Sequence, residues 1–496
     1  MARQRTVIKN IIYSFGTRII ILILGFILPR LLITSFGSEV NGLLSTVTQI
    51  FTYLALLEAG IGNSAVNALY KPLKEKDYAI ANEVMNEAQR YFQKVSIIYG
   101  ICVLIFAVIY PFCTHSSIGK GTIFWIIILQ GLSSVITYYF SAYYTHLLTA
   151  DGKRYINENI YFLTYVISSI LKILLILNGF GVISVQIGFL VISIIKAPCL
   201  YFICKKKYGW LKNIKKKNTN YLKERSAFVV HELSTAIFNS TDVFLISTFC
   251  DFALASVYTI YNLVYSSLNT ILSTINGSLI FLLGQGQYED HENFIKLYDI
   301  YSLAYTGVSF VIFTISFVLI KPFVTLYTQG INDVDYLLPG MAFLFTFINL
   351  LSASRATGSM LITVSGHAEN TKVRSIAEAV INLVSSIILV NIFQIRGVLL
   401  GTIIALLYRA NDIVIYANKN ILNRNPWQEY KRIIIYFLLF ALVALVGNNF
   451  PINIVNVKEF ILYGTVISLC VSALFIIVTF ITNYNLVMYW VKRITK

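Results

Sequence analysis

Residues 226–250, SAFVVHELSTAIFNSTDVFLISTFC, and 251–286, DFALASVYTIYNLVYSSLNTILSTINGSLIFLLGQG, are two long apolar segments that each carry a polar stripe. At 100° per residue along a helix, the first stripe spans about 140° and the second about 120°. The stripes consist of His231, Ser234, Thr235, Asn239 and Asp242, and of Tyr258, Tyr261, Asn262, Tyr265, Asn269, Ser273 and Asn276. Because an unsatisfied polar group in hydrocarbon costs several kcal/mol, neither stripe can face lipid. The two segments therefore predict a polar cavity between membrane helices, and we expect the rest of the chain to form its walls.

The composition is that of a membrane protein. Of 496 residues, 57% are apolar and 12% are charged, and the mean hydropathy is +0.72. Globular domains carry about 25% charged residues, so this chain belongs to the all-α polytopic membrane class. The formal charge of +16 would suggest a nucleic-acid partner in a soluble protein, but here the basic residues report membrane topology.

Taking about 20 residues per span, we predict fourteen transmembrane helices. They lie near 10–35, 41–68, 92–113, 122–149, 156–178, 181–204, 226–250, 254–284, 298–326, 339–364, 375–394, 397–417, 433–450 and 460–482. If the N-terminus is cytoplasmic, the inner segments hold 29 of the 39 Lys and Arg residues and the outer segments hold four. The positive-inside rule then places both termini in the cytoplasm. The first span lacks a small-residue cleavage site, which indicates an uncleaved first helix.

Two similar halves are expected. Short charged segments follow spans 2 and 8, which suggests a parallel repeat of six plus six spans. The domains are then an N-lobe (1–204, spans 1–6), a basic linker (205–225), a C-lobe (226–417, spans 7–12) and two final spans with a cytoplasmic tail (418–496). Nine basic residues in the linker are expected to rest on anionic headgroups, or to serve only as a topology signal.

Polar stripes recur in the N-lobe. They consist of Gln130, Ser134, Thr137, Ser141 and Tyr144 in span 4, and of Asn157, Tyr161, Thr164, Ser168 and Lys172 in span 5. Ser, Thr and Asn also join membrane helices through hydrogen bonds, but such interfaces favour small residues over Tyr. We therefore expect a solvated substrate path. The residues that line it would include Tyr258, Asn262, Tyr265, Asn269, Tyr161 and Thr137.

Basic residues within spans are candidates for binding an anion, because each costs about 2.5–3.5 kcal/mol at the bilayer centre. Arg18 and Arg355 have no acidic neighbour on their own helices and are the first candidates. Arg30, Lys172 and Lys196 lie close enough to span ends for their charges to reach the headgroups, and Arg30 is kept as a third candidate. Arg409 and Asp412 are three residues apart, so we expect a helix ion pair.

Acidic residues in the spans suggest ion coupling. Glu232 and Asp242, with His231 beside them, could bind a coupling proton or Na⁺. The alternative is a buried ion pair with Arg18, Arg355 or Arg409. Glu58 lies toward the inner end of span 2, where an interfacial position is equally compatible with the sequence.

Enzyme chemistry finds no support in the sequence. HExxH, Walker and GxSxG motifs are absent, the six cysteines lack paired spacing, and no metal ligand or cofactor is expected apart from the coupling ion. A polysaccharide polymerase or ligase would need a large outer loop, and every outer loop has about a dozen residues or fewer.

Two stretches resemble a known family. They are GFILPRLLITSFGSEVNGLLSTVTQIFTYLALLEAGIGNSAVNALYKPLKEKD (25–77), with Pro29, Gly37 and Gly42, and NSTDVFLISTFCDFALASVYTIYNLVY (239–265), with Asp242 and Tyr258. The chain is similar to bacterial O-antigen and capsule-type oligosaccharide flippases of the multidrug/oligosaccharidyl-lipid/polysaccharide (MOP) exporter superfamily.

The resemblance implies a function in polysaccharide biosynthesis. It implies that two six-helix lobes rock around a central cationic cavity and move an undecaprenyl-diphosphate-linked glycan to the outer leaflet. Arg18, Arg355 and Arg30 would then bind the diphosphate, and the residues that line the substrate path would bind the glycan. It also implies a polysaccharide polymerase and other assembly proteins as partners. The alternatives are a cation-coupled multidrug antiporter of the same superfamily and a flippase for a peptidoglycan or teichoic-acid lipid precursor.

Overall fold

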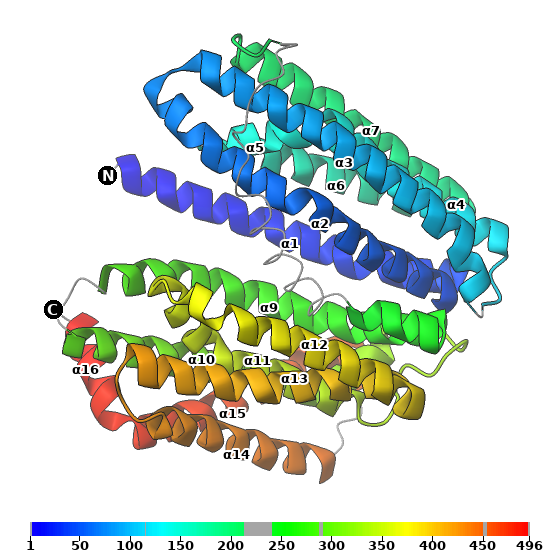
Figure 1. Cartoon of the computed structure of the whole chain (residues 1–496). Coiled ribbons are helices and arrows are strands. Elements are labelled where there is room, and N and C mark those ends of the chain that lie inside the picture. The colour runs from blue at the N-terminus through cyan, green and yellow to red at the C-terminus, as the bar shows by residue number, and fades with distance from the viewer. Residues whose placement is uncertain (1, 115, 213–240, 287–290, 450–453, 495–496) are drawn as a thin grey trace. The chain divides into compact units, whose positions relative to one another are not determined.

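The chain is an all-α, multi-pass membrane protein, as predicted. The computed structural model describes residues 2–114, 116–212, 241–286, 291–449 and 454–494, and in these residues it contains helices and no strand (Figure 1). Ten of the helices in this part of the chain are long and apolar enough to cross a membrane. The helix α11 (Met341–Val364) is not among the ten, although its 24 residues suffice in length, because it carries several polar residues.

The chain divides into two compact units, Met1–Ser256 and Val257–Lys496. Unit 1 contains α1 (Ala2–Phe36), α2 (Ser38–Glu75), α3 (Tyr78–Cys113), α4 (Lys120–Phe140), α5 (Ala142–Ala150), α6 (Arg154–Leu177), α7 (Val182–Lys207) and a helical segment over 241–249. Its core joins α2, α3, α4, α5 and α7 through buried side chains such as Leu43, Phe92, Ile126, Leu147 and Leu200.

Unit 2 contains the long helix α9, in which the boundary between the units lies, and the helices that follow α9 in the sequence. These are α9 (Phe252–Gly286, whose first turn belongs to unit 1), α10 (His291–Tyr327), α11, α12 (Ala368–Phe393), α13 (Ile395–Tyr416), the π-helix η1 (Ala417–Ile421), α14 (Trp427–Asn449), α15 (Val457–Thr482) and α16 (Tyr484–Ile494). The helix α13 packs against both α12 and α11, while α10 packs against α11, α14 and α15.

The predicted division lay at the linker 205–225, and most of that linker lies outside the described residues. The segment 241–249, which was predicted as the end of the first C-lobe span, packs in unit 1. Tyr53 Oη lies 2.5 Å from Thr241 Oγ1, and Tyr110 Oη lies 3.1 Å from Ser247 Oγ. The predicted domain limits therefore stay predictions.

One predicted span is broken. The sequence indicated a single helix over 122–149, but α4 ends at Phe140 and α5 begins at Ala142. Ser141 between them has φ −136° and ψ −16°, and its hydroxyl donates to the carbonyl of Thr137 at 2.9 Å. A serine hydroxyl that bonds to the backbone four residues earlier competes with regular helix geometry. The break lets α5 take its own direction within unit 1.

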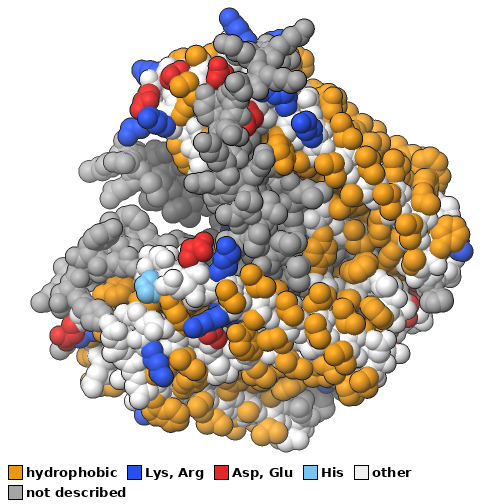
Figure 2. Space-filling view, viewed as in Figure 1, with side chains coloured by type: hydrophobic (Ala, Val, Ile, Leu, Met, Phe, Trp, Pro, Cys, Tyr) orange, Lys and Arg blue, Asp and Glu red, His pale blue; other side chains and the backbone are white. Residues whose placement is uncertain are grey.

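Apolar side chains cover much of the outer surface of each unit (Figure 2). On α3, for example, Ile97, Ile101, Leu104, Val108 and Phe112 are all more than half exposed. A water-soluble protein would not leave such a continuous row uncovered. These surfaces are the ones that face lipid.

Candidate functional site

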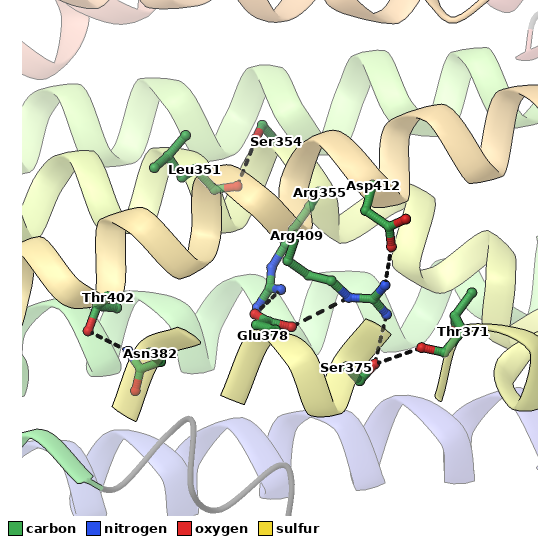
Figure 3. A network of polar contacts seen from close by, with 10 residues as sticks. All are labelled: Leu351, Ser354, Arg355, Thr371, Ser375, Glu378, Asn382, Thr402, Arg409 and Asp412. Atoms are coloured by element: carbon green, nitrogen blue, oxygen red, sulfur yellow. Dashed lines mark hydrogen bonds and ion pairs between the residues drawn. The ribbon is translucent and has the colours of Figure 1, made fainter. Parts of the chain in front are cut away.

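Five charged side chains form a chain of ion pairs inside unit 2, and Figure 3 shows four of them, Arg355, Glu378, Arg409 and Asp412. In order, they are Arg355, Glu378, Arg409, Asp412 and Arg374, and we call them the arginine network. Arg355 and Arg409 contact the two oxygens of Glu378, the latter at 3.4 Å from Nε. Arg409 and Arg374 contact the two oxygens of Asp412, the latter at 2.8 Å from Nη1. Each carboxylate therefore serves two guanidinium groups.

The arginine network is buried at its centre and open at one end. The side chains of Arg409 and Glu378 are 7% and 9% exposed, whereas that of Arg374 is 41% exposed. Glu378 lies ten residues after Ala368, which places it about 15 Å along α12. The network thus lies well inside the length of a membrane span, and Arg374 is the member that a ligand reaches most easily.

Close packing of α12 and α13 brings the charges together. Gln394, with φ 51°, turns the chain between the two helices. A Cβ on Gly397 would lie 2.0 Å from the carbonyl oxygen of Leu389, and one on Gly401 would lie 2.3 Å from Ser386 Oγ. Only glycine allows this approach. The helices then run side by side, and Glu378 on α12 meets Arg409 on α13.

Part of this site was predicted. The ion pair between Arg409 and Asp412, three residues apart on one helix, is confirmed. The prediction for Arg355 considered acids on its own helix only, and the structure supplies Glu378 from α12. Glu378 and Arg374 were missed. Their signal in the sequence was an acid and a base one turn apart at the start of span 11. The role of Arg355 toward a diphosphate stays a prediction.

The polar stripe of α9 is used within unit 2. Tyr261 Oη donates to the carbonyl of Tyr336 at 3.0 Å, Tyr265 Oη lies 2.6 Å from Thr346 Oγ1, and Asn269 donates to Asn349 at 2.6 Å. Such bonds join membrane helices. The remaining stripe residues whose side chains are described are Tyr258, which is buried and packs on Phe345, the half-buried Asn262, and the exposed Ser273, which donates to the carbonyl of Thr270 at 2.9 Å. Their role toward a glycan stays a prediction.

The other predicted residues lie in unit 1. Tyr161 on α6 is 46% exposed and stacks on Tyr165, and Thr137 donates to the carbonyl of Ser133. Arg18 and Arg30 are exposed on α1, and each has a polar or aromatic contact. Asp242 is half-buried in the segment 241–249 and also has a contact. Glu232 and His231 lie outside the described residues.

Lys172 and Lys196 were expected to snorkel, and the structure gives each an aromatic partner. The ammonium of Lys172 lies 4.3 Å from the centroid of the Phe189 ring, and that of Lys196 lies 5.6 Å from the Tyr161 ring. A cation over an aromatic face is stabilised where water is scarce.

A contact between a carboxylate and an imidazole, in unit 1, was not predicted. Glu58 on α2 and His146 on α5 meet with 3.1 Å between Oε1 and Nε2. The two residues are 88 positions apart, so no local pattern in the sequence pairs them. Among the described residues, no group of three or more His, Cys, Asp or Glu side chains could hold a metal ion.

Comparison with solved structures gives the fold. The lipid II flippase MurJ in an inward closed conformation aligns with 96% of this chain and 100% of its own, with a TM-score of 0.69 and 15% identity. A multidrug resistance MATE family transporter of the MOP superfamily, in an inward-facing conformation, aligns with 87% of this chain and 96% of its own, with a TM-score of 0.63 and 14% identity. The chain has the fold of these two structures.

A third similar structure shows that this fold holds pockets of different charge. It is a MOP superfamily transporter from Pyrococcus furiosus, and the reverse polarity of its binding pocket is said to suggest a different function. It aligns with 82% of this chain and 95% of its own, with a TM-score of 0.54 and 15% identity. A scan against protein-family models gave no match, and a search of curated proteins gave none either. These MOP structures are of transporters and a flippase, not of enzymes.

Proposed function

We propose that this chain is a flippase that moves an undecaprenyl-diphosphate-linked oligosaccharide from the cytoplasmic to the outer leaflet of a bacterial plasma membrane. Its two units would alternate between inward and outward access, with both termini in the cytoplasm. The support is the shared fold with a lipid II flippase, together with the resemblance of residues 25–77 and 239–265 to oligosaccharide flippases.

The observation that carries the proposal is the arginine network. Its five described charges are three guanidinium groups and two carboxylates, and Arg374 shares Asp412 with the more deeply buried Arg409. A diphosphate can therefore pair with Arg374, since a shared carboxylate leaves its charge incompletely balanced. Planar guanidinium groups suit phosphate oxygens geometrically. A carrier of cationic drugs would need an excess of negative charge at such a site.

The other predicted residues take roles around this site. Arg18, Arg30 and Arg355 would also compensate the diphosphate as it crosses. Tyr258, Asn262, Tyr265, Asn269, Tyr161 and Thr137 would contact the sugars. Asp242, Glu232 and His231 would bind the coupling H⁺ or Na⁺, and a polysaccharide polymerase would receive the product.

The test is flipping of fluorescent undecaprenyl-diphosphate-linked oligosaccharide in proteoliposomes, scored by access of an external quencher. Purified wild-type chain should flip the lipid. Arg374→Gln should slow flipping about tenfold or more, because a lost charge-assisted contact is worth at least 1.4 kcal/mol. Lys372→Gln is the matched control, since Lys372 is equally exposed on the same helix and pairs at 3.9 Å with Glu369.

Other outcomes separate the alternatives. If wild-type chain leaves this lipid in place but extrudes a cationic dye, the chain is a multidrug antiporter. If it flips a lipid carrying a peptidoglycan or teichoic-acid precursor at least as fast, the substrate class is the wider one. Equal flipping by Arg374→Gln and wild type would remove the arginine network from the substrate site.

A further inference from the structure

Unit 1 holds a carboxylate and an imidazole in contact near the middle of the long helix α2. Glu58 lies 20 residues after Ser38, where α2 begins, and 17 before Glu75, where it ends. Its side chain is 18% exposed and that of His146 is 20% exposed, so both are partly accessible at the surface. Both groups change charge when they take up a proton.

The surrounding residues hold the imidazole in place. The ring of His146 stacks on that of Phe92, with centroids 5.3 Å apart and planes 15° from parallel. On the side of α2, a Cβ at Gly62 would lie 2.2 Å from His146 Cε1 and 2.5 Å from Nε2. The missing side chain at Gly62 therefore makes the niche that the ring occupies. One turn earlier on the same helix, Glu58 meets the ring nitrogen.

Charged and titratable groups reach this pair from the neighbouring helices. Tyr138 on α4 and Lys196 on α7 interact electrostatically with Glu58, and Lys196 also interacts with Glu158 on α6. Tyr99 on α3 interacts with Tyr138. Glu158 in turn pairs with Arg154 on its own helix at 3.0 Å, so these two charges cancel. With His146 neutral, the charges of Glu58 and Lys196 then balance, and a proton on His146 is held by the carboxylate that the ring contacts.

We propose that Glu58 and His146 form a proton-binding site, and that the ion coupled to the proposed transport is a proton bound there. In the unprotonated state, the Nε2–H of neutral His146 donates to the ionised Glu58. The added proton binds Nδ1 and gives an imidazolium paired with the carboxylate. The new ion pair draws α5 toward α2, and this is a local charge change of the kind that biases a bistable element.

The chemistry of the pair favours H⁺ over Na⁺. Sodium is a hard cation, and hard cations are held by several oxygen ligands. One oxygen of Glu58 already faces an imidazole nitrogen, and the ammonium of Lys196 lies close enough to repel a second cation. A proton needs only one basic atom, which His146 supplies.

A substrate-free experiment tests the proton site. The chain has five histidines, so ring-¹⁵N-labelled full-length protein in lipid nanodiscs gives few signals, and His146→Gln identifies the one from His146. Between about pH 5 and pH 8, where histidines titrate, the His146 signal should change from neutral to protonated, and Glu58→Gln should alter that response. Glu75→Gln, an exposed change near the end of the same helix, should leave it as in wild type. A His146 signal that is constant over this range, or that Glu58→Gln leaves unaltered, overturns the site.

A second measurement tests the coupling and depends on the proposed function. In proteoliposomes, an imposed pH gradient should accelerate flipping by wild type and by Glu75→Gln, whereas Glu58→Gln and His146→Gln should lose this acceleration. Acceleration by a Na⁺ gradient in place of the pH gradient, or an undiminished response in both variants, overturns the coupling. If wild type flips no oligosaccharide lipid at all, the proposed function fails while the titration of His146 still decides the proton site.

Discussion

Arg409 is the centre of the arginine network because its guanidinium reaches three different groups. It contacts Glu378 and Asp412, and its Nη2 donates to Ser375 Oγ at 2.8 Å. A guanidinium that is 7% exposed in a membrane helix loses its water, and only opposite charges and acceptors replace it. Removing one carboxylate is therefore more damaging than its single charge suggests.

Glu378→Gln should destabilise the protein by about 3 kcal/mol, because Arg355 and Arg409 both lose this carboxylate while their charges stay buried. The measurement is thermal unfolding of the purified chain in detergent. Glu369→Gln, on the same helix, removes a carboxylate that is 84% exposed and pairs with Lys372 at 3.9 Å, so it should change the stability by less than about 1 kcal/mol. Unfolding of Glu378→Gln at the wild-type temperature would show that the network contributes nothing to stability.

Gly62→Ala should expel the imidazole of His146 from its niche. The new methyl group would meet Cε1 at 2.2 Å, and the stacked ring of Phe92 leaves no room for retreat. Overpacking of this kind costs about 1–3 kcal/mol, so thermal stability should fall and the ¹⁵N signals of the His146 ring should shift. Gly25→Ala on α1, where a Cβ meets nothing within 4 Å, is the control and should be neutral or slightly stabilising. An unshifted His146 signal in Gly62→Ala would contradict the packing described.

Among the elements, α14 is attached to α10 and η1 by a buried polar cluster. Arg424 donates to both oxygens of Asp299 at 2.7 and 2.8 Å, and its Nε donates to Asn418 at 2.8 Å. Glu429 accepts from Asn418 at 2.7 Å and from Tyr298 at 3.0 Å. Burial alone would lower the pKa of Arg424, but the bonds to Asp299 outweigh it and raise the pKa. The first of the two predicted final spans, α14, is thereby held to α10 and η1 at its N-terminal end.

Arg424→Gln should loosen this attachment, because a neutral amide cannot replace the paired bonds to Asp299. We expect faster cleavage within 422–426, between η1 and α14, by a protease of broad specificity added to the detergent-solubilised chain. Lys419→Gln serves as control, since Lys419 is an exposed residue of η1. Equal cleavage rates in wild type and Arg424→Gln would show that α14 is held by its apolar packing alone.

In unit 1, side-chain hydrogen bonds hold the start of α3 and the residues that follow α7. Asp77 caps α3 by accepting from the backbone N–H of Ile80 at 3.1 Å, and Tyr208, just after α7, donates to Asp151 at 2.6 Å. The carbonyl of Lys212 accepts from Asn86 at 2.9 Å. The first residues of the predicted basic linker are therefore fixed to unit 1 and do not swing freely.

For the whole molecule, the sequence predicted what depends on one helix at a time. Hydropathy along the chain predicted the membrane class and the all-α fold, and spacing along one helix predicted the pair of Arg409 and Asp412. The break at Ser141 was missed because hydropathy carries no information about a local backbone dihedral angle. Contacts between helices were missed too. Glu378 meets Arg355 from another helix, and packing, not spacing, decides which faces of two helices meet.

The orientation of the whole molecule in the membrane gives the last prediction. Basic residues are concentrated in the segments around the inner ends of predicted spans 2, 6 and 12, and the positive-inside rule assigns these segments to the cytoplasm. In a cysteine-free background, cysteines at Lys74 and Lys419 should react with a membrane-impermeant maleimide only after the cells are permeabilised. Lys458, exposed in the first turn of α15, and Asn332, exposed between α10 and α11, should react as cysteines in intact cells. An even number of spans separates Lys74 from Lys419 if the fourteen-span prediction holds, so the two must agree with each other whatever the orientation. If both cysteines react in intact cells, the molecule has the opposite orientation, and the direction of transport relative to the arginine network is reversed. If only one of them reacts, the predicted number of spans is wrong.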